Sequence, residues 1–245
     1  MTISGQPRRH IHGFKELKKW FLDRYNIDVY LHAWVDKKFY KYDFFDQGKV
    51  QKVHKVTSKL YDELLELYQP KDYLFEKAIQ FEATEIKGSH NQRLNSQMSM
   101  WMSLQRAWNL IEQSDIKYDL IIRTRYDLLF THQVALTCPF IEDITQLDPN
   151  QLHYFKYPNH WHLSPQMNDQ FAVGGYDVMK TYHSVFSNML YYIFHDEEYK
   201  ATYPDPFVNE PLIYYHLNYS NIHMNGIDHG FEGHRGLDAG AQIMR

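Results

Sequence analysis

Residues 118–130 have the sequence YDLIIRTRYDLLF. This segment is apolar through Ile122, a pattern that predicts a strand covered on both faces of a sheet. Arg123, Arg125 and Asp127 follow at the carboxyl end of the apolar run. Open α/β sheets bind their ligands at that end of their strands. Two guanidiniums and a carboxylate at this place indicate a site for a phosphorylated, partly metal-neutralised ligand.

These three charged residues alternate along an extended chain, so we expect them to point to one side of the sheet. Two cations can neutralise a diphosphate, and a carboxylate beside them can bind a divalent metal or a ribose hydroxyl. The alternative is an Arg–Asp ion pair that merely closes the strand end. We favour the ligand site, because two like charges buried close together are costly without an anionic partner.

The composition limits the classes of protein that are possible. A chain of 245 residues can bury a sizeable core, and we expect one domain. Its formal charge of −4 gives no general attraction to nucleic acid or to anionic membranes. We find neither a membrane-spanning stretch nor a signal pattern, and Cys138, the single cysteine, excludes a disulfide framework and a zinc site of several thiolates. These features predict a soluble, cytoplasmic protein.

Strand and helix patterns alternate through the first half of the chain. Strands are predicted at 1–4, 27–34, the start of 73–81, 118–130, 152–157 and 170–174; helices are predicted at 12–25, from a cap at 57 or 58, from a cap at 95 or 96, and at 177–194 and 211–217. This order predicts an α/β fold with a mainly parallel, Rossmann-type sheet, followed by a mixed α+β half. We assign 1–130 to a nucleotide-binding half and 131–245 to an acceptor half. We expect the Gly-, His- and Asp-rich tail at 225–240 to be mobile or ordered by a ligand, and not part of the core.

A second candidate site lies between the first predicted strand and the first helix. Here Ser4, Gly5, Gln6 and Arg8 surround Pro7. Backbone N–H groups at such a junction, together with the arginine, can cradle a phosphate or bind a base. The alternative is a simple Gly-Pro turn with a surface arginine.

The second half has carboxylates of its own. Asp169 precedes a predicted strand and could take a proton from a substrate hydroxyl as a general base. The alternative is an Asx-type turn or a helix cap. Glu210, just before Pro211, is either an acid at a helix N-terminus or a second active-site carboxylate.

Histidines are numerous, but their spacing matches no strong zinc motif. We expect His160 and His162 to be solvated or to contact a sugar. For His229 and His234 in the tail, one histidine reaching back to a metal is an alternative.

Six blocks, in chain order, carry a resemblance to a known family. They are SGQPR at 4–8, VYLHAW at 29–34, the set Asn95, Ser96, Gln97 and Ser99, YDLIIRTRYDL at 118–128, NDQF at 168–171, and Glu210 with the helix after it. Together these blocks resemble a family of glycosyltransferases found in bacterial surface-polysaccharide gene sets and in some large viruses. The block at 118–128 is the most specific.

The resemblance implies a GT-A-like fold, a nucleoside diphosphate sugar as donor, and a divalent metal such as Mn or Mg. Such enzymes hold metal and diphosphate with an Asp-x-Asp element. Arg125 stands at the first acid position here, so only Asp127 carries over, as the ligand of the metal or of ribose. The other implied roles are nucleotide binding by Ser4, Gly5, Gln6, Arg8 and Gln97, diphosphate binding by Arg123 and Arg125, and base catalysis by Asp169 or, second, Glu210.

We therefore predict a hexosyl- or pentosyltransferase of polysaccharide biosynthesis that acts on a glycan or a lipid-linked acceptor. The alternative is a non-catalytic carbohydrate- or nucleotide-binding protein that uses the same cleft. A third possibility is an enzyme of different chemistry on a similar sheet, because a fold does not fix a function.

Overall fold

The fold was analysed in a computed structural model of the chain. It describes residues 1–35, 44–46, 49–51, 59–79, 81, 89–130, 143–156, 167–227 and 241–243. The strands are β1 (Thr2–Gly5), β2 (Tyr30–Trp34), β3 (Phe44–Asp46), β4 (Lys49–Gln51), β5 (Asp72–Glu76), β6 (Ile121–Thr124), β7 (Leu128–Phe130), β8 (Gln151–Lys156), β9 (Met167–Gly174), β10 (His223–Ile227) and β11 (Ala241–Ile243). The helices are α1 (His10–Leu17), the π-helical η1 (Lys18–Leu22), α2 (Lys59–Tyr68), α3 (Ser89–Gln113), the 3-10 turn η2 (Ile144–Gln146), α6 (Tyr176–His183), α7 (Val185–His195), α8 (Glu197–Thr202) and α9 (Asn209–Tyr219).

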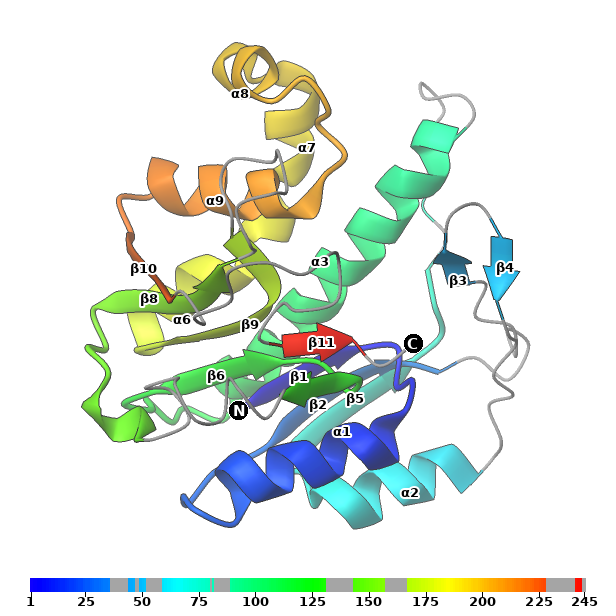
Figure 1. The fold of residues 1–245 in the computed structure, drawn as a ribbon, viewed down its shortest axis with the longest axis vertical. Helices are drawn as coiled ribbons and strands as arrows, with labels where there is room; N and C mark the ends of the chain where they lie inside the picture. Colours follow the sequence, from blue (N-terminus) through cyan, green and yellow to red (C-terminus); the bar gives the residue numbers. More distant parts are fainter. Residues whose placement is uncertain are drawn as a thin grey trace, which may run out of the picture.

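A seven-stranded sheet forms the centre of the molecule, in the order β10-β8-β9-β6-β1-β2-β5 (Figure 1). β5, β2, β1 and β6 are parallel to one another, and β9 is antiparallel to both of its neighbours, β6 and β8. The sheet therefore takes strands from both predicted halves. The predicted α/β fold class, with a mainly parallel sheet that continues into a mixed half, is confirmed.

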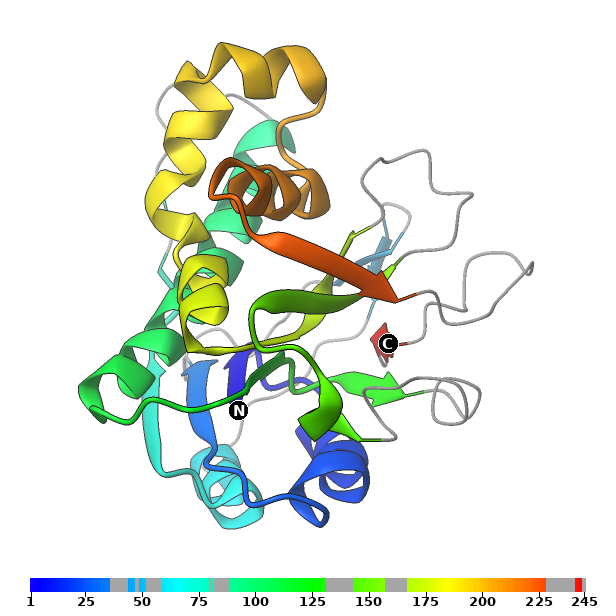
Figure 2. The same ribbon diagram turned by 90° about the vertical axis from the view of Figure 1, so that its left-hand side faces the viewer.

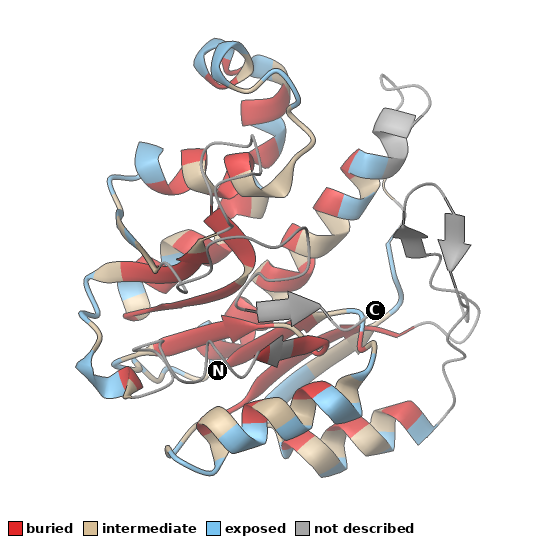
Figure 3. Ribbon diagram, viewed as in Figure 1, coloured by how far each residue is buried: buried red, intermediate tan, exposed pale blue. Residues whose placement is uncertain are grey.

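Helices cover both faces of this sheet. α1 and α2 lie on one face, while α3, α6, α7 and α9 lie on the other (Figures 1 and 2). A hydrophobic core lies on each face of the sheet, and successive residues of a strand point to opposite cores. Ile122 belongs to the core under α1 and α2, and Ile121 belongs to the core under α3. Figure 3 shows the central strands as the most continuously buried part of the fold. The prediction that the apolar run at 120–122 is covered on both sides is thus confirmed for Ile121 and Ile122.

Several predicted boundaries differ from the structure. The helix expected to start at a cap on Asn95 or Ser96 begins at Ser89. Asn95 therefore lies within the helix, and its side chain accepts a hydrogen bond from the Phe81 backbone N–H, at 2.7 Å, instead of capping the helix. The first helix starts at His10 rather than residue 12 and ends in η1. The helix predicted over 177–194 is two helices, α6 and α7, which meet at Ser184.

The tail prediction is wrong at its beginning, because Asn225, Gly226 and Ile227 belong to β10 and pair in parallel with β8. The remainder of that tail up to residue 240, with His229 and His234, lies outside the described residues, as do Cys138, His160 and His162. Within the described part of the chain, no helix is both long enough and apolar enough to cross a membrane.

Candidate active site

A pocket of about 430 Å³ opens at the carboxyl edge of the parallel strands. The loop after β1, the ends of β2 and β6, and the start of β9 converge there, because β9 runs opposite to its neighbours. Its lining residues in the described part of the chain are Ser4, Gly5, Gln6, Arg8, Trp34, Ser96, Ser99, Met100, Arg123, Arg125, Asp169 and Asn209. Seven of the predicted site residues are among these twelve.

The loop between β1 and α1 forms one wall of the pocket. Gly5 has φ +112°, a backbone conformation that favours glycine, so the chain can leave the strand sharply at this point. The Arg8 backbone N–H then donates to the Gln6 carbonyl at 2.8 Å, and α1 begins two residues later. The junction between β1 and α1 is thus the Gly-Pro turn of the alternative interpretation. It is also a wall of the pocket, to which Arg8 contributes.

The segment at 123–127 does not continue as an extended strand, and the prediction of alternation through Asp127 is wrong. β6 ends at Thr124, and the chain turns at Tyr126 and Asp127. The cause is the buried Tyr126 ring, whose hydroxyl donates to the His32 carbonyl at 3.1 Å and draws the chain into the core. Asp127 consequently folds back toward Arg125.

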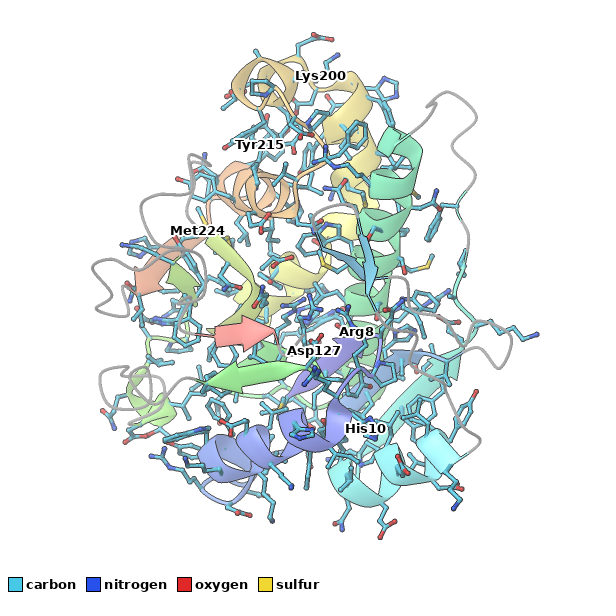
Figure 4. The ribbon with its side chains drawn as sticks, turned by 45° about the vertical axis from the view of Figure 1, so that its right-hand side comes forward. Arg8, His10, Asp127, Lys200, Tyr215 and Met224 are labelled. Atoms are coloured by element: carbon cyan, nitrogen blue, oxygen red, sulfur yellow. The ribbon has the colours of Figure 1, made fainter. Side chains whose placement is uncertain are left out.

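Asp127 is the centre of an ion-pair cluster. Arg125 donates to it through Nε at 3.0 Å and Nη2 at 3.3 Å, and Arg8 Nη2 lies 3.1 Å from Oδ2. Figure 4 shows Arg8 and Asp127 facing each other above α1. The carboxylate is only 1% exposed. The Arg–Asp ion pair that the alternative interpretation predicted at the end of β6 is therefore present. It also includes Arg8, which comes from the loop between β1 and α1.

Arg123 is the most deeply placed cation of the site. It is buried, and its Nη1 donates a hydrogen bond to the backbone carbonyl of Asp169. Its Nε has no hydrogen-bond partner among the described residues. None of the described carboxylates lies within salt-bridge distance of this guanidinium, so it is a favourable site for an anion.

Asp169 lies inside β9, not before it as predicted, because the strand begins at Met167. Asn168 Oδ1 accepts a hydrogen bond from the Gln170 backbone N–H at 2.7 Å, so the Asx-type contact of the alternative interpretation exists on the neighbouring residue. Asp169 itself is one of the residues that line the pocket, and it is largely buried. Among the described lining residues, Asp169 is the one with a carboxylate.

Gln97 and Glu210 lie next to the pocket lining but are not part of it. Gln97 is buried in α3, between Ser96 and Met100 of the lining, and neither atom of its amide has a hydrogen-bond partner in the described residues. Glu210 lies in the first turn of α9, beside Asn209, which does line the pocket.

Five lining residues were not among the predicted site residues: Trp34, Ser96, Ser99, Met100 and Asn209. Trp34 Nε1 donates to the Ser99 carbonyl at 3.0 Å, which joins the end of β2 to α3. Trp34, Ser96 and Ser99 lie within blocks that carry the family resemblance. The sequence therefore marked these residues, but it did not indicate that they line the pocket. Met100 and Asn209 had no signal of this kind.

A Ser–His–Glu row lies behind Trp34. His32 Nδ1 is 2.6 Å from Ser103 Oγ, and its Nε2 is 3.0 Å from Glu76, which also pairs with Arg106 at 3.3 Å. Burial lowers the pKa of His32 to about 4, against the opposing effect of Glu76. Ser103 is completely buried in the middle of α3, so this row supports the sheet and does not form a nucleophilic site.

The residues around Asp127 do not suit a divalent metal ion. Hard cations of this kind take six or more oxygen ligands. Both oxygens of Asp127 are already bonded to guanidiniums, those of Arg125 and Arg8, and the described lining adds one more arginine, Arg123, and one further acidic residue, Asp169. Among the described residues, no three His, Cys, Asp or Glu side chains are grouped as metal ligands.

Comparisons with known proteins give only distant similarities. No family model and no curated protein sequence matches the chain. A glycosyltransferase involved in the glycosylation of the major capsid of PBCV-1 is 17% identical, over 69% of this chain and 74% of that one, with a TM-score of 0.38. The glycosyltransferase GlyE of Streptococcus pneumoniae TIGR4 is 10% identical, over 92% of this chain and 45% of its own, with a TM-score of 0.41; its apo form is 13% identical, with a TM-score of 0.38 and coverages of 91% and 44%. Because every TM-score is below 0.5, these likenesses decide nothing about activity.

Proposed function

We propose that this protein is a glycosyltransferase that moves a hexosyl or pentosyl group from a nucleoside diphosphate sugar to a glycan or a lipid-linked acceptor. One observation carries the proposal. Arg8, Arg123 and Arg125 surround, with the carboxylate of Asp169, a single pocket at the carboxyl edge of a parallel sheet. A dianionic leaving group needs such cations, and an acceptor hydroxyl needs such a base.

The loop after β1 is the proposed nucleotide-binding wall. Ser4, Gly5 and Gln6 line the pocket together with the Trp34 side chain. Aromatic rings of this type stack on bases and sugars. The diphosphate would then lie toward the arginines, where planar guanidiniums can each donate two parallel hydrogen bonds to phosphate oxygens.

The proposed reaction needs one base and one stabilised leaving group. The acceptor hydroxyl oxygen forms a bond with the anomeric carbon, and its proton passes to the Asp169 carboxylate. The bond between the anomeric carbon and the diphosphate oxygen breaks, and the electron pair leaves with the nucleoside diphosphate. Preorganised cations contribute most at the point where this negative charge develops. Glu210 is the second candidate for the base, because it follows Asn209 in the wall.

The test is a thermal-shift panel of nucleoside diphosphate sugars, measured with Mn and with a chelator. One donor should stabilise the protein by about 2.7 kcal/mol at a hundred times its dissociation constant, a rise of roughly 5–10 °C in Tm. A flat panel would contradict the proposal. The stabilising donor is then incubated with glycan and lipid-linked acceptors, and release of nucleoside diphosphate is measured. Donor binding without release for any acceptor would instead identify a non-catalytic binding protein.

A further inference from the structure

The carboxylate of Asp127 is the place where a metal ion would be expected, yet in this structure it serves two arginines. Arg125 approaches it with two nitrogens, at 3.0 and 3.3 Å, and Arg8 approaches at 3.1 Å. A divalent cation bound to this carboxylate would lie beside two guanidinium charges. It would have to displace both of them or withstand their repulsion, which is strong at separations of a few ångströms.

The charges of the described residues around the pocket leave one surplus positive charge, when Asp127 and Asp169 are set against Arg8, Arg123 and Arg125. Arg8 and Arg125 both pair with Asp127. Arg123 is buried, contacts a carbonyl of Asp169 but not its carboxylate, and has a buried Nε without a partner among the described residues. A buried cation is costly when it has no ion-pair partner, and Arg123 has none among the described residues, so the site is favourable for an anion even when no metal accompanies it.

We infer that Asp127 is an internal counter-ion and not a metal ligand, and that the three arginines bind the donor's diphosphate without a divalent cation. In the absence of donor, Asp127 holds Arg8 and Arg125 in place. When the diphosphate arrives, its oxygens take over N–H groups that Asp127 shares, and they also reach Arg123. The identity of the anion rests on the proposed function, but the absence of a metal requirement does not.

Asp127→Asn separates the two roles, because they predict opposite results. An internal counter-ion competes with the ligand, so its neutralisation should leave the metal-free affinity for a diphosphate unchanged or raise it up to roughly tenfold. A metal ligand supports binding, so its neutralisation should abolish it. The probe is inorganic pyrophosphate, titrated calorimetrically into the full chain in buffer with EDTA and again in buffer with magnesium chloride.

Arg125→Gln gives a second measurement that does not depend on the Asp127 variant folding. It should weaken metal-free pyrophosphate binding by about tenfold or more, since it removes a bidentate, charge-assisted contact. The matched controls are Asp177→Asn and Lys180→Gln, which make the same charge changes at exposed positions. Both controls should bind pyrophosphate like the original chain, and circular dichroism should confirm that every variant is folded.

The inference is supported if pyrophosphate binds in EDTA, binds at least as tightly to the Asp127→Asn variant, and binds more weakly to the Arg125→Gln variant. It is overturned if binding appears only with magnesium, if it is absent in both buffers, if a folded Asp127→Asn variant loses it, or if Arg125→Gln leaves it unchanged. Sugar transfer that needs a metal would contradict this inference alone. Metal-free pyrophosphate binding by a chain that transfers no sugar would contradict the proposed function alone.

Discussion

Asp169 is the residue on which the proposed chemistry depends most directly. Asp169→Asn keeps the size of the side chain but removes the basic carboxylate, so the rate of sugar transfer should fall by about 10²- to 10⁴-fold. Donor affinity should stay close to that of the original chain, because the base acts on the acceptor. Steady-state kinetics and donor calorimetry measure the two quantities separately.

Asp177→Asn, at an exposed position of α6, is the control for this experiment. It should leave the rate unchanged. If Asp169→Asn transferred sugar at the original rate, the base would have to be sought elsewhere, and Glu210→Gln would be the next variant to measure.

At the scale of single residues, the sequence indicated which side chains matter better than it indicated their contacts. Arg123, Arg125 and Asp169 were expected in one site from their place beside predicted strands, and all three line one pocket. The pairing of Arg8 with Asp127 was not foreseeable, because it joins loops that are distant in sequence. The turn that makes it possible depends on the burial of Tyr126, and an apolar run with a tyrosine in it does not reveal where the strand ends.

Helix α1 reaches the site because it contains Gly13. A Cβ atom at this position would lie 1.8 Å from the Tyr126 carbonyl oxygen, so only glycine allows the helix to pack against the turn at 125–127. Gly13→Ala must push the helix and the turn apart, and overpacking of this kind costs about 1–3 kcal/mol. We expect a loss of that size in the free energy of unfolding, measured by urea denaturation.

The same variant should also weaken pyrophosphate binding, because it moves Arg8 away from Arg123 and Arg125, the two other arginines proposed to bind the ligand. Lys15→Ala, at an exposed position of the same helix, is the control and should change stability by no more than about 0.5 kcal/mol. Equal stability of Gly13→Ala and the original chain would show that the contact between α1 and the turn is not as close as described.

At the scale of elements, the alternation of strands and helices could be predicted from the sequence, but the direction of each strand in the sheet could not. The alternation of strands and helices through residue 130 gave the parallel part of the sheet, because crossover helices require it. An apolar run such as 171–174 predicts a strand but has no feature that specifies its direction, so the antiparallel β9 could not be foreseen. The break between α6 and α7 at Ser184 has no Pro or Gly to announce it.

At the scale of the whole molecule, buried histidines make stability depend on pH. Burial lowers the pKa of His183 to about 3, helped by the charge of Arg123, and lowers that of His32 to about 4. Both rings are neutral in the fold, whereas an unfolded histidine binds a proton near pH 6.5. Between pH 6.5 and pH 4 the unfolded state therefore holds more protons, and the free energy of unfolding must fall as the pH falls.

Each of these histidines should contribute a slope approaching 1.4 kcal/mol per pH unit, so the two together approach about 3 kcal/mol per pH unit. Urea denaturation between pH 7.5 and pH 5 measures this slope as the change of the unfolding free energy with pH. His183→Gln should reduce it by up to about 1.4 kcal/mol per pH unit, while His195→Gln, at an exposed position, should not change it. A free energy that stays constant down to pH 5 would contradict the burial of these rings.

The central place of β1 in the sheet also has a consequence for biosynthesis. One edge of β1 pairs with β2, and the other edge pairs with β6. β6 is synthesised much later than β1, because Thr2 and its partner Ile122 are 120 residues apart in sequence. A ribosome that adds roughly 5–20 residues per second would expose this edge for on the order of ten seconds. An apolar edge of that kind invites pairing with other nascent chains. The yield of folded protein should therefore depend on translation speed and on chaperones that shield the amino-terminal strands until residue 124 has emerged.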